Sequence, residues 1–257
     1  MIALASLLGW SEELASVWGV VFLRVGAMAA LLPGFGESSI PMRIKLGIGV
    51  CFTLIVAPAV YPNVQMYLAV NSNFTLLLFT ETLIGVALGI GTRLFVIALQ
   101  TAGAIAAQAT SLSQLFGGAG IDPLPAIGHI LVVSGLALAV MMDLHVHIVR
   151  ILVMSYDGFP IGQFPNRFWF SEWGVHNIAK TFSLAFVLAA PFFIGSVIYN
   201  AALGIINKAM PQLMVAFVGA PAITAASMFL LAVSAPFMLS LWIEEFAYFL
   251  SDPVDLN

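Results

Sequence analysis

Charged residues are scarce in this chain of 257 residues: Asp, Glu, Lys and Arg together make up 8% of it. Soluble domains carry about 25% charged residues, so a water-soluble core does not explain this composition. The eight Lys and Arg residues form no basic stripe, which argues against nucleic-acid binding. Cys51 is the only cysteine, which excludes an internal disulfide and a cysteine-rich metal or cluster site.

Motifs of enzymatic sites are also missing. The sequence has no Walker A loop, no dinucleotide glycine fingerprint, no HExxH and no GxSxG. Its four histidines and scattered serines show no nucleophile–base pairing at a useful spacing. We therefore expect a protein that is not an enzyme and that binds no metal or cofactor.

Hydrophobic residues, in contrast, make up 61% of the chain, and the mean hydropathy is +1.08. A membrane-spanning helix needs about 20 apolar residues. The pattern predicts one all-α, polytopic membrane domain, 1–257. Its second segment is short, with Pro58 and Pro62 as helix breakers at its end, and its long last segment is kinked or re-entrant. The six apolar segments are Leu14–Leu32, Leu46–Val60, Phe74–Leu99, Ala126–Val153, Ile178–Ile206 and Leu213–Ile243.

Polar and helix-breaking residues interrupt the apolar tract between Pro191 and Pro221. Lipid cannot satisfy freed backbone groups, so such a break survives only where protein or a water-filled cavity surrounds it. The tract therefore predicts a hairpin built for assembly or conduction. The interrupting residues are Asn200, Gly204, Asn207, Lys208, Pro211, Gln212 and Gly219.

Two ionisable residues, Arg24 and Glu81, lie deep inside apolar segments. A charge at a helix centre costs about 2.5–3.5 kcal/mol on insertion scales, so it usually faces protein or water. The two side chains could pair between helices as an assembly bond, which we favour, or serve a transport site. Arg93 and Lys180 lie near segment ends, where their long side chains can snorkel toward the interface.

A polar cluster lies at Asp143, His145 and His147. The two histidines are about 200° apart on a regular helix, so they cannot share one metal ion. Asp143, His147 and Arg150 share a helix face at offsets of four and seven residues. A hydrogen-bonded structural cluster is the favoured interpretation, with a proton-coupled role as the alternative.

Small residues predict close helix packing at Gly85 and Gly89, which form a GxxxG motif, and onward to Gly103. The uncharged stretch that begins at Gln108 then mixes amides and hydroxyls with Leu112, Leu115 and Phe116, and it ends in glycines such as Gly117 and Gly118. It is either a plain surface loop or a mobile gate that closes a pore by dewetting.

Spaced landmarks along nearly the whole chain resemble the FliR family of flagellar type III export-gate proteins. The stretch from Pro191 to Pro221 is the most specific, whereas Leu144 departs from the family's usual glycine and His147 is an extra histidine. The landmarks are Arg24, Pro33, Phe35-Gly36, Pro41, Arg43, Lys45, Pro58, Glu81, Gly85, Gly89, Phe95, Ala102-Gly103, Gln108, Asp122-Pro123, Asp143, His145, Ser155, Phe159-Pro160, Pro191, Asn200, Ala202-Leu203-Gly204, Asn207-Lys208, Pro211-Gln212, Gly219 and Pro221.

The resemblance implies a single copy in a hetero-oligomeric gate with FliP and FliQ, wrapped on its cytoplasmic side by FlhB, through which unfolded flagellar proteins are exported. It implies a FliP-like part, 1–175, and a FliQ-like hairpin, 176–250. The plug would be 108–122, and the hairpin tip toward FlhB would be Asn207, Lys208, Pro211 and Gln212. Arg24, Glu81, Asp143, His145 and Asn200 would then be buried polar groups of the assembly.

The implied location is the bacterial inner membrane at the flagellar basal body, in contact with lipid. Counting positive charges in the loops agrees weakly, since Arg43, Lys45 and Lys208 would share the cytoplasmic side. Two alternatives stay open: the homologous gate subunit of a virulence injectisome and, less favoured, a secondary transporter with broken helices.

Overall fold

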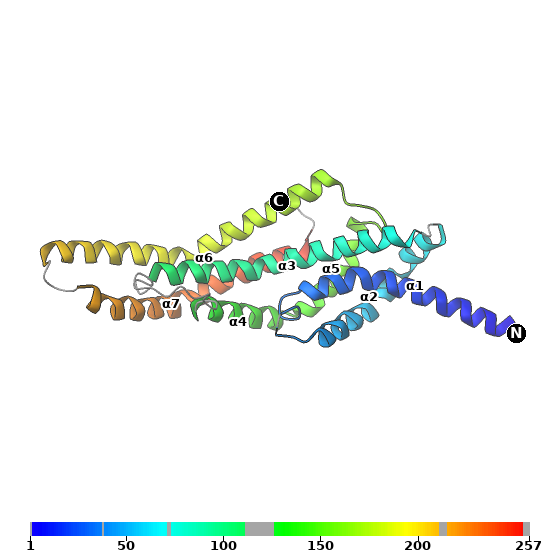
Figure 1. Cartoon of the computed structure of the whole chain (residues 1–257), viewed down its shortest axis with the longest axis horizontal. Helices are drawn as coiled ribbons and strands as arrows, with labels where there is room; N and C mark the ends of the chain where they lie inside the picture. The colour runs from blue at the N-terminus through cyan, green and yellow to red at the C-terminus, as the bar shows by residue number, and fades with distance from the viewer. Residues whose placement is uncertain (1, 38, 71–72, 111–125, 211–214, 254–257) are drawn as a thin grey trace. The chain divides into compact units, whose positions relative to one another are not determined.

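The computed structural model describes residues 2–37, 39–70, 73–110, 126–210 and 215–253, with side chains from Glu13 onward except at 110 and 215–221. The described residues form seven α-helices and no strand (Figure 1). The helices are α1 (Ile2–Leu31), α2 (Met42–Val70), α3 (Phe74–Thr110), α4 (Ala126–Met141), α5 (Leu144–Gly158), α6 (Arg167–Ala209) and α7 (Val215–Ser251).

Five of these helices are long and apolar enough to cross a membrane. Together α4 and α5 form a broken pair that counts as a sixth candidate span. An α-helix suits this composition because it satisfies every interior backbone group within its own segment, which lipid cannot do. The protein is therefore an all-helical polytopic membrane protein, and the fold class predicted from sequence is confirmed.

Prolines do not end the helices where the sequence pattern placed the breaks. Pro58 and Pro62 lie inside α2, which is 29 residues long. Pro191 lies inside α6, which is 43 residues long, in agreement with a predicted segment, Ile178–Ile206, that runs through it. The prediction of a short second segment was wrong. A proline removes one backbone hydrogen bond, but ending a helix in an apolar environment would leave several groups without partners.

The predicted continuous segment Ala126–Val153 is also wrong, because the helix breaks at Asp143. This residue adopts a left-handed conformation, with φ 56° and ψ 42°, and its side chain makes no capping hydrogen bond. Asp tolerates this region better than most residues. Its carbonyl then accepts hydrogen bonds from the backbone N–H groups of Val146, at 2.8 Å, and His147, at 3.2 Å, which start α5.

The chain divides into two compact units, each with its own buried side chains. Unit 1 comprises Met1–Leu94, Val140–Asn177 and Ala247–Asn257, and within it α1 packs along α2. Unit 2 comprises Phe95–Ala139 and Ile178–Phe246, with Leu99, Leu131, Phe192, Trp242 and Phe246 fully buried.

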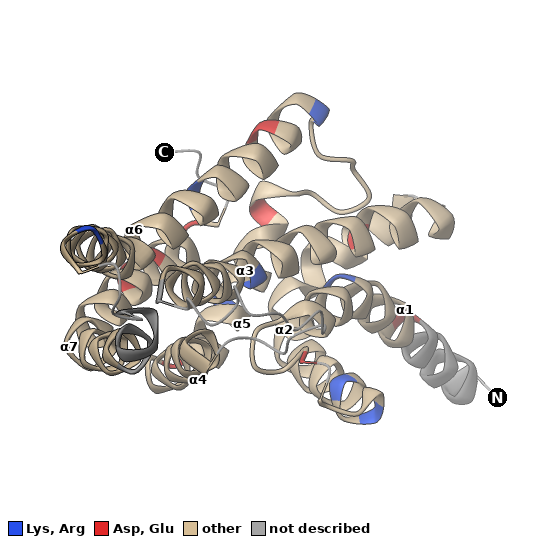
Figure 2. Ribbon diagram, turned by 60° about the vertical axis from the view of Figure 1, so that its left-hand side comes forward, with Lys and Arg blue, Asp and Glu red and all other residues tan. Residues whose placement is uncertain are grey.

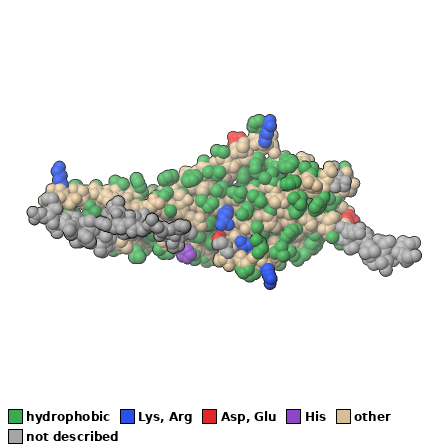
Figure 3. All heavy atoms as spheres, in the orientation of Figure 1, with side chains coloured by type: hydrophobic (Ala, Val, Ile, Leu, Met, Phe, Trp, Pro, Cys, Tyr) green, Lys and Arg blue, Asp and Glu red, His purple; other side chains and the backbone are tan. Residues whose placement is uncertain are grey.

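Charged residues are sparse along the helices, and hydrophobic side chains cover much of the visible surface (Figures 2 and 3). Large exposed apolar residues include Phe79 on α3, Phe186 on α6 and Phe237 on α7. A soluble monomer rarely exposes such extended apolar surface, so lipid or other proteins must cover it.

Candidate functional site

Arg24 and Glu81 form a fully buried ion pair in unit 1. Arg24 Nε on α1 donates to Glu81 Oε2 on α3 at 2.8 Å, and both side chains are 0% exposed. The pairing expected from two charges in apolar segments is thus present, and it joins two helices of the same chain. Neither side chain has exposed surface, so this chain alone buries both of them.

The other two nitrogens of the guanidinium reach α5 and the loop after it. Nη1 donates to Ser155 Oγ and Nη2 donates to the Phe159 carbonyl, both at 3.0 Å. Glu81 Oε1 in turn accepts a hydrogen bond from the backbone N–H of Gly162 at 3.2 Å. Every nitrogen of the guanidinium and both carboxylate oxygens therefore have a partner, which is the condition for a tolerable buried charge pair.

The ring of Tyr156 completes this network, with the Arg24 Cζ atom 3.8 Å from the ring centroid. A guanidinium over an aromatic face is attracted by the ring quadrupole, and more strongly when both are removed from water. The Tyr156 hydroxyl is itself buried without a hydrogen-bond partner among the described residues. Ser155 and Phe159 are landmarks of the family resemblance, but their contacts to Arg24 were not predicted from sequence, and neither were the roles of Tyr156 and Gly162.

Glycines on α3 make the ion pair geometrically possible. A Cβ atom on Gly85 would lie 2.2 Å from the Arg24 carbonyl oxygen, and one on Gly89 would lie 2.9 Å from Leu31 Cβ. Glu81, Gly85 and Gly89 are spaced by four residues, so they share one face of the helix. Close backbone approach at Gly85 thus brings the short side chain of Glu81 within reach of Arg24.

The third predicted packing glycine, Gly103, lies in unit 2. A Cβ atom there would be 2.1 Å from Gly128 Cα, so the backbones of α3 and α4 are in contact. A Cβ on Gly128 would have ordinary contacts, the nearest at 3.5 Å. Gly103 therefore tolerates no side chain in this packing, whereas Gly128, which was not among the predicted packing glycines, does.

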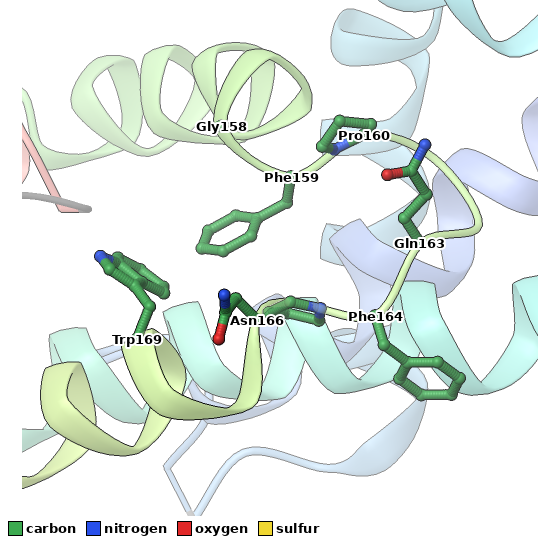
Figure 4. A pocket seen from close by; sticks show the side chains of 8 residues that line it. Gly158, Phe159, Pro160, Gln163, Phe164, Asn166 and Trp169 are labelled. Carbon is green, nitrogen blue, oxygen red and sulfur yellow. The ribbon is translucent and has the colours of Figure 1, made fainter.

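An open cavity of about 520 Å³ lies beside the loop between α5 and α6. Phe159, Phe164, Asn166 and Trp169 are among the residues that line it, and Figure 4 shows Phe159 and Trp169 on one side of the loop. The Phe159 and Trp169 rings are 5.4 Å apart at their centroids. A second open cavity of about 420 Å³ is lined by Asn63, Met66, Tyr67, Val70, Tyr156, Pro160, Ile161 and Gln163.

The polar cluster after α4 does not form the expected hydrogen-bonded group. Asp143, His145 and Arg150 are exposed, and no hydrogen bond joins their side chains or that of His147 in the described part of the chain. The cause is the left-handed break at Asp143, which removes that residue from the helix face assumed for it. Among the described residues there is no group of His, Cys, Asp and Glu that could hold a metal ion.

The remaining predicted site residues are exposed on α3 and α6 or lie outside the described residues. Gln108 is exposed near the end of α3, and Asn200, Asn207 and Lys208 are exposed on α6. Asn200 is thus not buried within the chain. Leu112, Leu115, Phe116, Gly117, Gly118, Pro211 and Gln212 lie outside the described residues.

Comparison with known proteins places the chain in a family. The family model described as bacterial export proteins, family 1, matches residues 15–249. The flagellar biosynthetic protein FliR of Caulobacter vibrioides is 32% identical over 232 residues, which cover 90% of this chain and 92% of that protein.

The FliR of Escherichia coli K12 is 31% identical over 87% of both chains. That of Bacillus subtilis is 28% identical over 83% of this chain and 84% of its own. With a family model that covers most of the chain and relatives of more than 30% identity over nearly their full length, the protein belongs to the FliR family of bacterial export proteins.

Proposed function

We propose that this protein is a structural subunit of the flagellar type III export gate, and that it forms with FliP and FliQ the channel for unfolded flagellar proteins. The family match over residues 15–249 is the observation that carries this proposal. The relatives' names favour the flagellar system over a virulence injectisome, since they are flagellar biosynthetic proteins. The location is then the inner membrane at the basal body.

The surface of α6 and α7 supports a role in assembly. In the most apolar window of Ala222–Ser251, 17% of the residues are buried, against 61% in that of Phe74–Ala109. Asn200 lies on this exposed surface between Val197 and Ile205, and it has no hydrogen-bond partner among the described residues. Lipid cannot satisfy an amide, so a neighbouring protein chain or water must.

Copurification tests the proposal directly. Tagged full-length protein is expressed with the FliP and FliQ of its own organism, and the complex is weighed by native mass spectrometry. We expect one copy per complex, and deletion of the gene should abolish flagellin secretion and motility. A protein that purifies alone and binds a small solute would instead be a transporter and would contradict the proposal.

A substitution of the exposed Asn200 tests whether this residue contacts another subunit. Asn200→Leu should reduce copurification of FliP and FliQ, because it removes the polar group that an apolar neighbour cannot provide. Ser240→Ala is the matched control on α7: its hydroxyl is exposed but already bonds to the Phe237 carbonyl at 2.9 Å. Equal recovery of partners with both variants would show that Asn200 faces water or lipid rather than a subunit.

The plug and the hairpin tip stay proposals drawn from the family resemblance. Replacing Leu112, Leu115 and Phe116 together by Ala should make the resting membrane leaky to small solutes, since a hydrophobic constriction closes by excluding water. Replacing the exposed α4 residues Ile130, Val133 and Val140 by Ala is the matched control. Tight membranes in both variants would place the seal elsewhere.

For the tip, we propose contact of Asn207, Lys208, Pro211 and Gln212 with FlhB. Asn207 and Lys208 are exposed at the end of α6 and available to a partner. Lys208→Glu should weaken copurification of FlhB while recovery of FliP and FliQ is unchanged, and Arg167→Glu, at the exposed first residue of the same helix, is the control. Unchanged recovery of FlhB with Lys208→Glu would contradict this contact.

A further inference from the structure

The loop from Phe159 to Asn166 between α5 and α6 depends on side chains from distant helices. Before Asn166, which precedes α6, it makes two backbone–backbone hydrogen bonds among the described residues: the Phe159 N–H donates to the Ser155 carbonyl at 2.9 Å, and the Gln163 N–H to the Pro160 carbonyl at 3.3 Å. Gly162 has a φ of +69°, and a Cβ atom there would lie 2.1 Å from the Tyr67 hydroxyl. The local sequence therefore offers little to fix this path.

Arg24 and Glu81 supply hydrogen-bond partners for the backbone of this loop. The Phe159 carbonyl accepts from Arg24 Nη2, and the Gly162 N–H donates to Glu81 Oε1, so the pair holds the loop at both of these residues. Buried backbone groups need such partners, since an unpaired group costs about as much as a lost hydrogen bond. Arg24 lies 135 residues from Phe159, so this support is entirely tertiary.

The guanidinium of Arg24 has two roles, which its nitrogens divide: pairing with Glu81 and bonding to α5 and the loop after it. Nε alone makes the ion pair with Glu81, while Nη1 and Nη2 point to Ser155 and Phe159. A lysine could keep the charge pair but is a point charge without the planar fork. If pairing were the whole purpose of Arg24, a lysine would serve as well.

We propose that Arg24 and Glu81 are positioning residues that hold the α5–α6 loop in place and thereby shape the two cavities beside it. Pro160 and Gln163 line both cavities, and Figure 4 shows both side chains on this loop. The loop keeps its arrangement because Arg24 bonds to Phe159 and Glu81 bonds to Gly162. This role goes beyond the proposed export function and does not depend on it.

Cysteine reactivity of the full-length protein in membranes tests this proposal. Cys51 is exposed and is first replaced by Ser. Ile161→Cys then places a reporter within the loop, where the native side chain is 6% exposed, and Phe164→Cys gives an always-accessible reference at a position that is 58% exposed. Labelling by N-ethylmaleimide is followed by mass shift.

Arg24→Lys should speed labelling at position 161 by about tenfold or more, because two charge-assisted hydrogen bonds are lost and the loop opens locally. Labelling at position 164 should not change. Ser155→Ala, which removes one side-chain contact and leaves the Phe159 bond, should change labelling at position 161 by less than about twofold. Gly162→Ala should also speed labelling at position 161, although the ion pair between Arg24 and Glu81 stays intact.

Two results would overturn the proposal. Unchanged protection at position 161 in Arg24→Lys would show that the ion pair alone suffices. A third reporter, Val56→Cys, lies in the core of unit 1, where the native side chain is 0% exposed. If Arg24→Lys exposes this position together with 161, the residue maintains the whole unit rather than the loop.

Discussion

The two compact units bury polar atoms in different ways. In unit 1 a charged network joins α1, α3, α5 and a loop through Arg24 and Glu81. In unit 2 the fully buried Trp242 donates its indole N–H to the Phe95 carbonyl at 2.8 Å, and its ring lies 5.1 Å from that of Phe246. Unit 1 also packs aromatic rings around Trp173, whose indole N–H donates to the Pro253 carbonyl at 2.8 Å, so the feature that sets it apart among the described residues is its fully buried ion pair.

Because of this difference, we expect different kinds of substitution to destabilise the two units. Removing one member of a buried ion pair leaves an uncompensated charge, which is strongly destabilising. Removing the single hydrogen bond of an aromatic core costs less, because the apolar contacts persist. Unit 1 should therefore be sensitive to the loss of one group, and unit 2 mainly to changes of volume. Four substitutions, taken from the largest expected effect to the smallest, test this contrast.

Arg24→Leu should destabilise the protein by about 3–5 kcal/mol, because Glu81 is left buried without its partner. The thermal unfolding temperature of the purified full-length chain in detergent measures the effect. The double variant Arg24→Leu with Glu81→Leu should recover much of the loss, since apolar replacement of both partners is often near neutral. The exposed Arg43→Leu is the control. Equal losses for the single and double variants would mean that the charge network is not the cause.

Gly103→Ala should cost about 1–3 kcal/mol, because the added methyl group would meet the Gly128 backbone and force α3 and α4 apart. Gly128→Ala, at the same crossing, should cost less, since its methyl group finds ordinary contact distances. Comparing the two unfolding temperatures isolates steric overlap from the general effect of replacing glycine. A larger loss for Gly128→Ala would refute this geometry.

Trp242→Phe should cost about 1–2 kcal/mol, through the lost N–H bond and a small cavity near Gly135. It should leave the Arg24 network of unit 1 intact, which protection of a cysteine at position 161 would report. A destabilisation as large as that caused by Arg24→Leu would contradict the proposed contrast between the units.

Lys180→Met should have the smallest effect, between about 0 and 1 kcal/mol, because ion pairs near the surface contribute little. Its ammonium pairs with Glu245 at 2.9 Å, with 31% and 37% of the two side chains exposed. The free energy of unfolding measured at low salt and at high salt should differ by a similarly small amount. A loss of several kcal/mol would show that this pair is buried in the working protein.

Some parts of the site were readable from the sequence. Arg24 and Glu81 stood out as charges inside apolar segments, and Gly85 and Gly89 stood out as a GxxxG motif of close helix packing. The sequence did not indicate the loop contacts of Arg24, because Phe159 and Gly162 take part through backbone atoms that every residue has. Nor did it indicate the break at Asp143, since no proline or glycine marks that position.

The sequence by itself determined the class of the protein: too few charges for a soluble core, enough long apolar segments for a helical membrane protein, and landmarks of the FliR family. Where the helices end and how the buried charges are satisfied were decided only by tertiary structure. The physical reason is that apolar periodicity is local, whereas a charge stays buried at Arg24 only when groups far along the chain provide its hydrogen-bond partners.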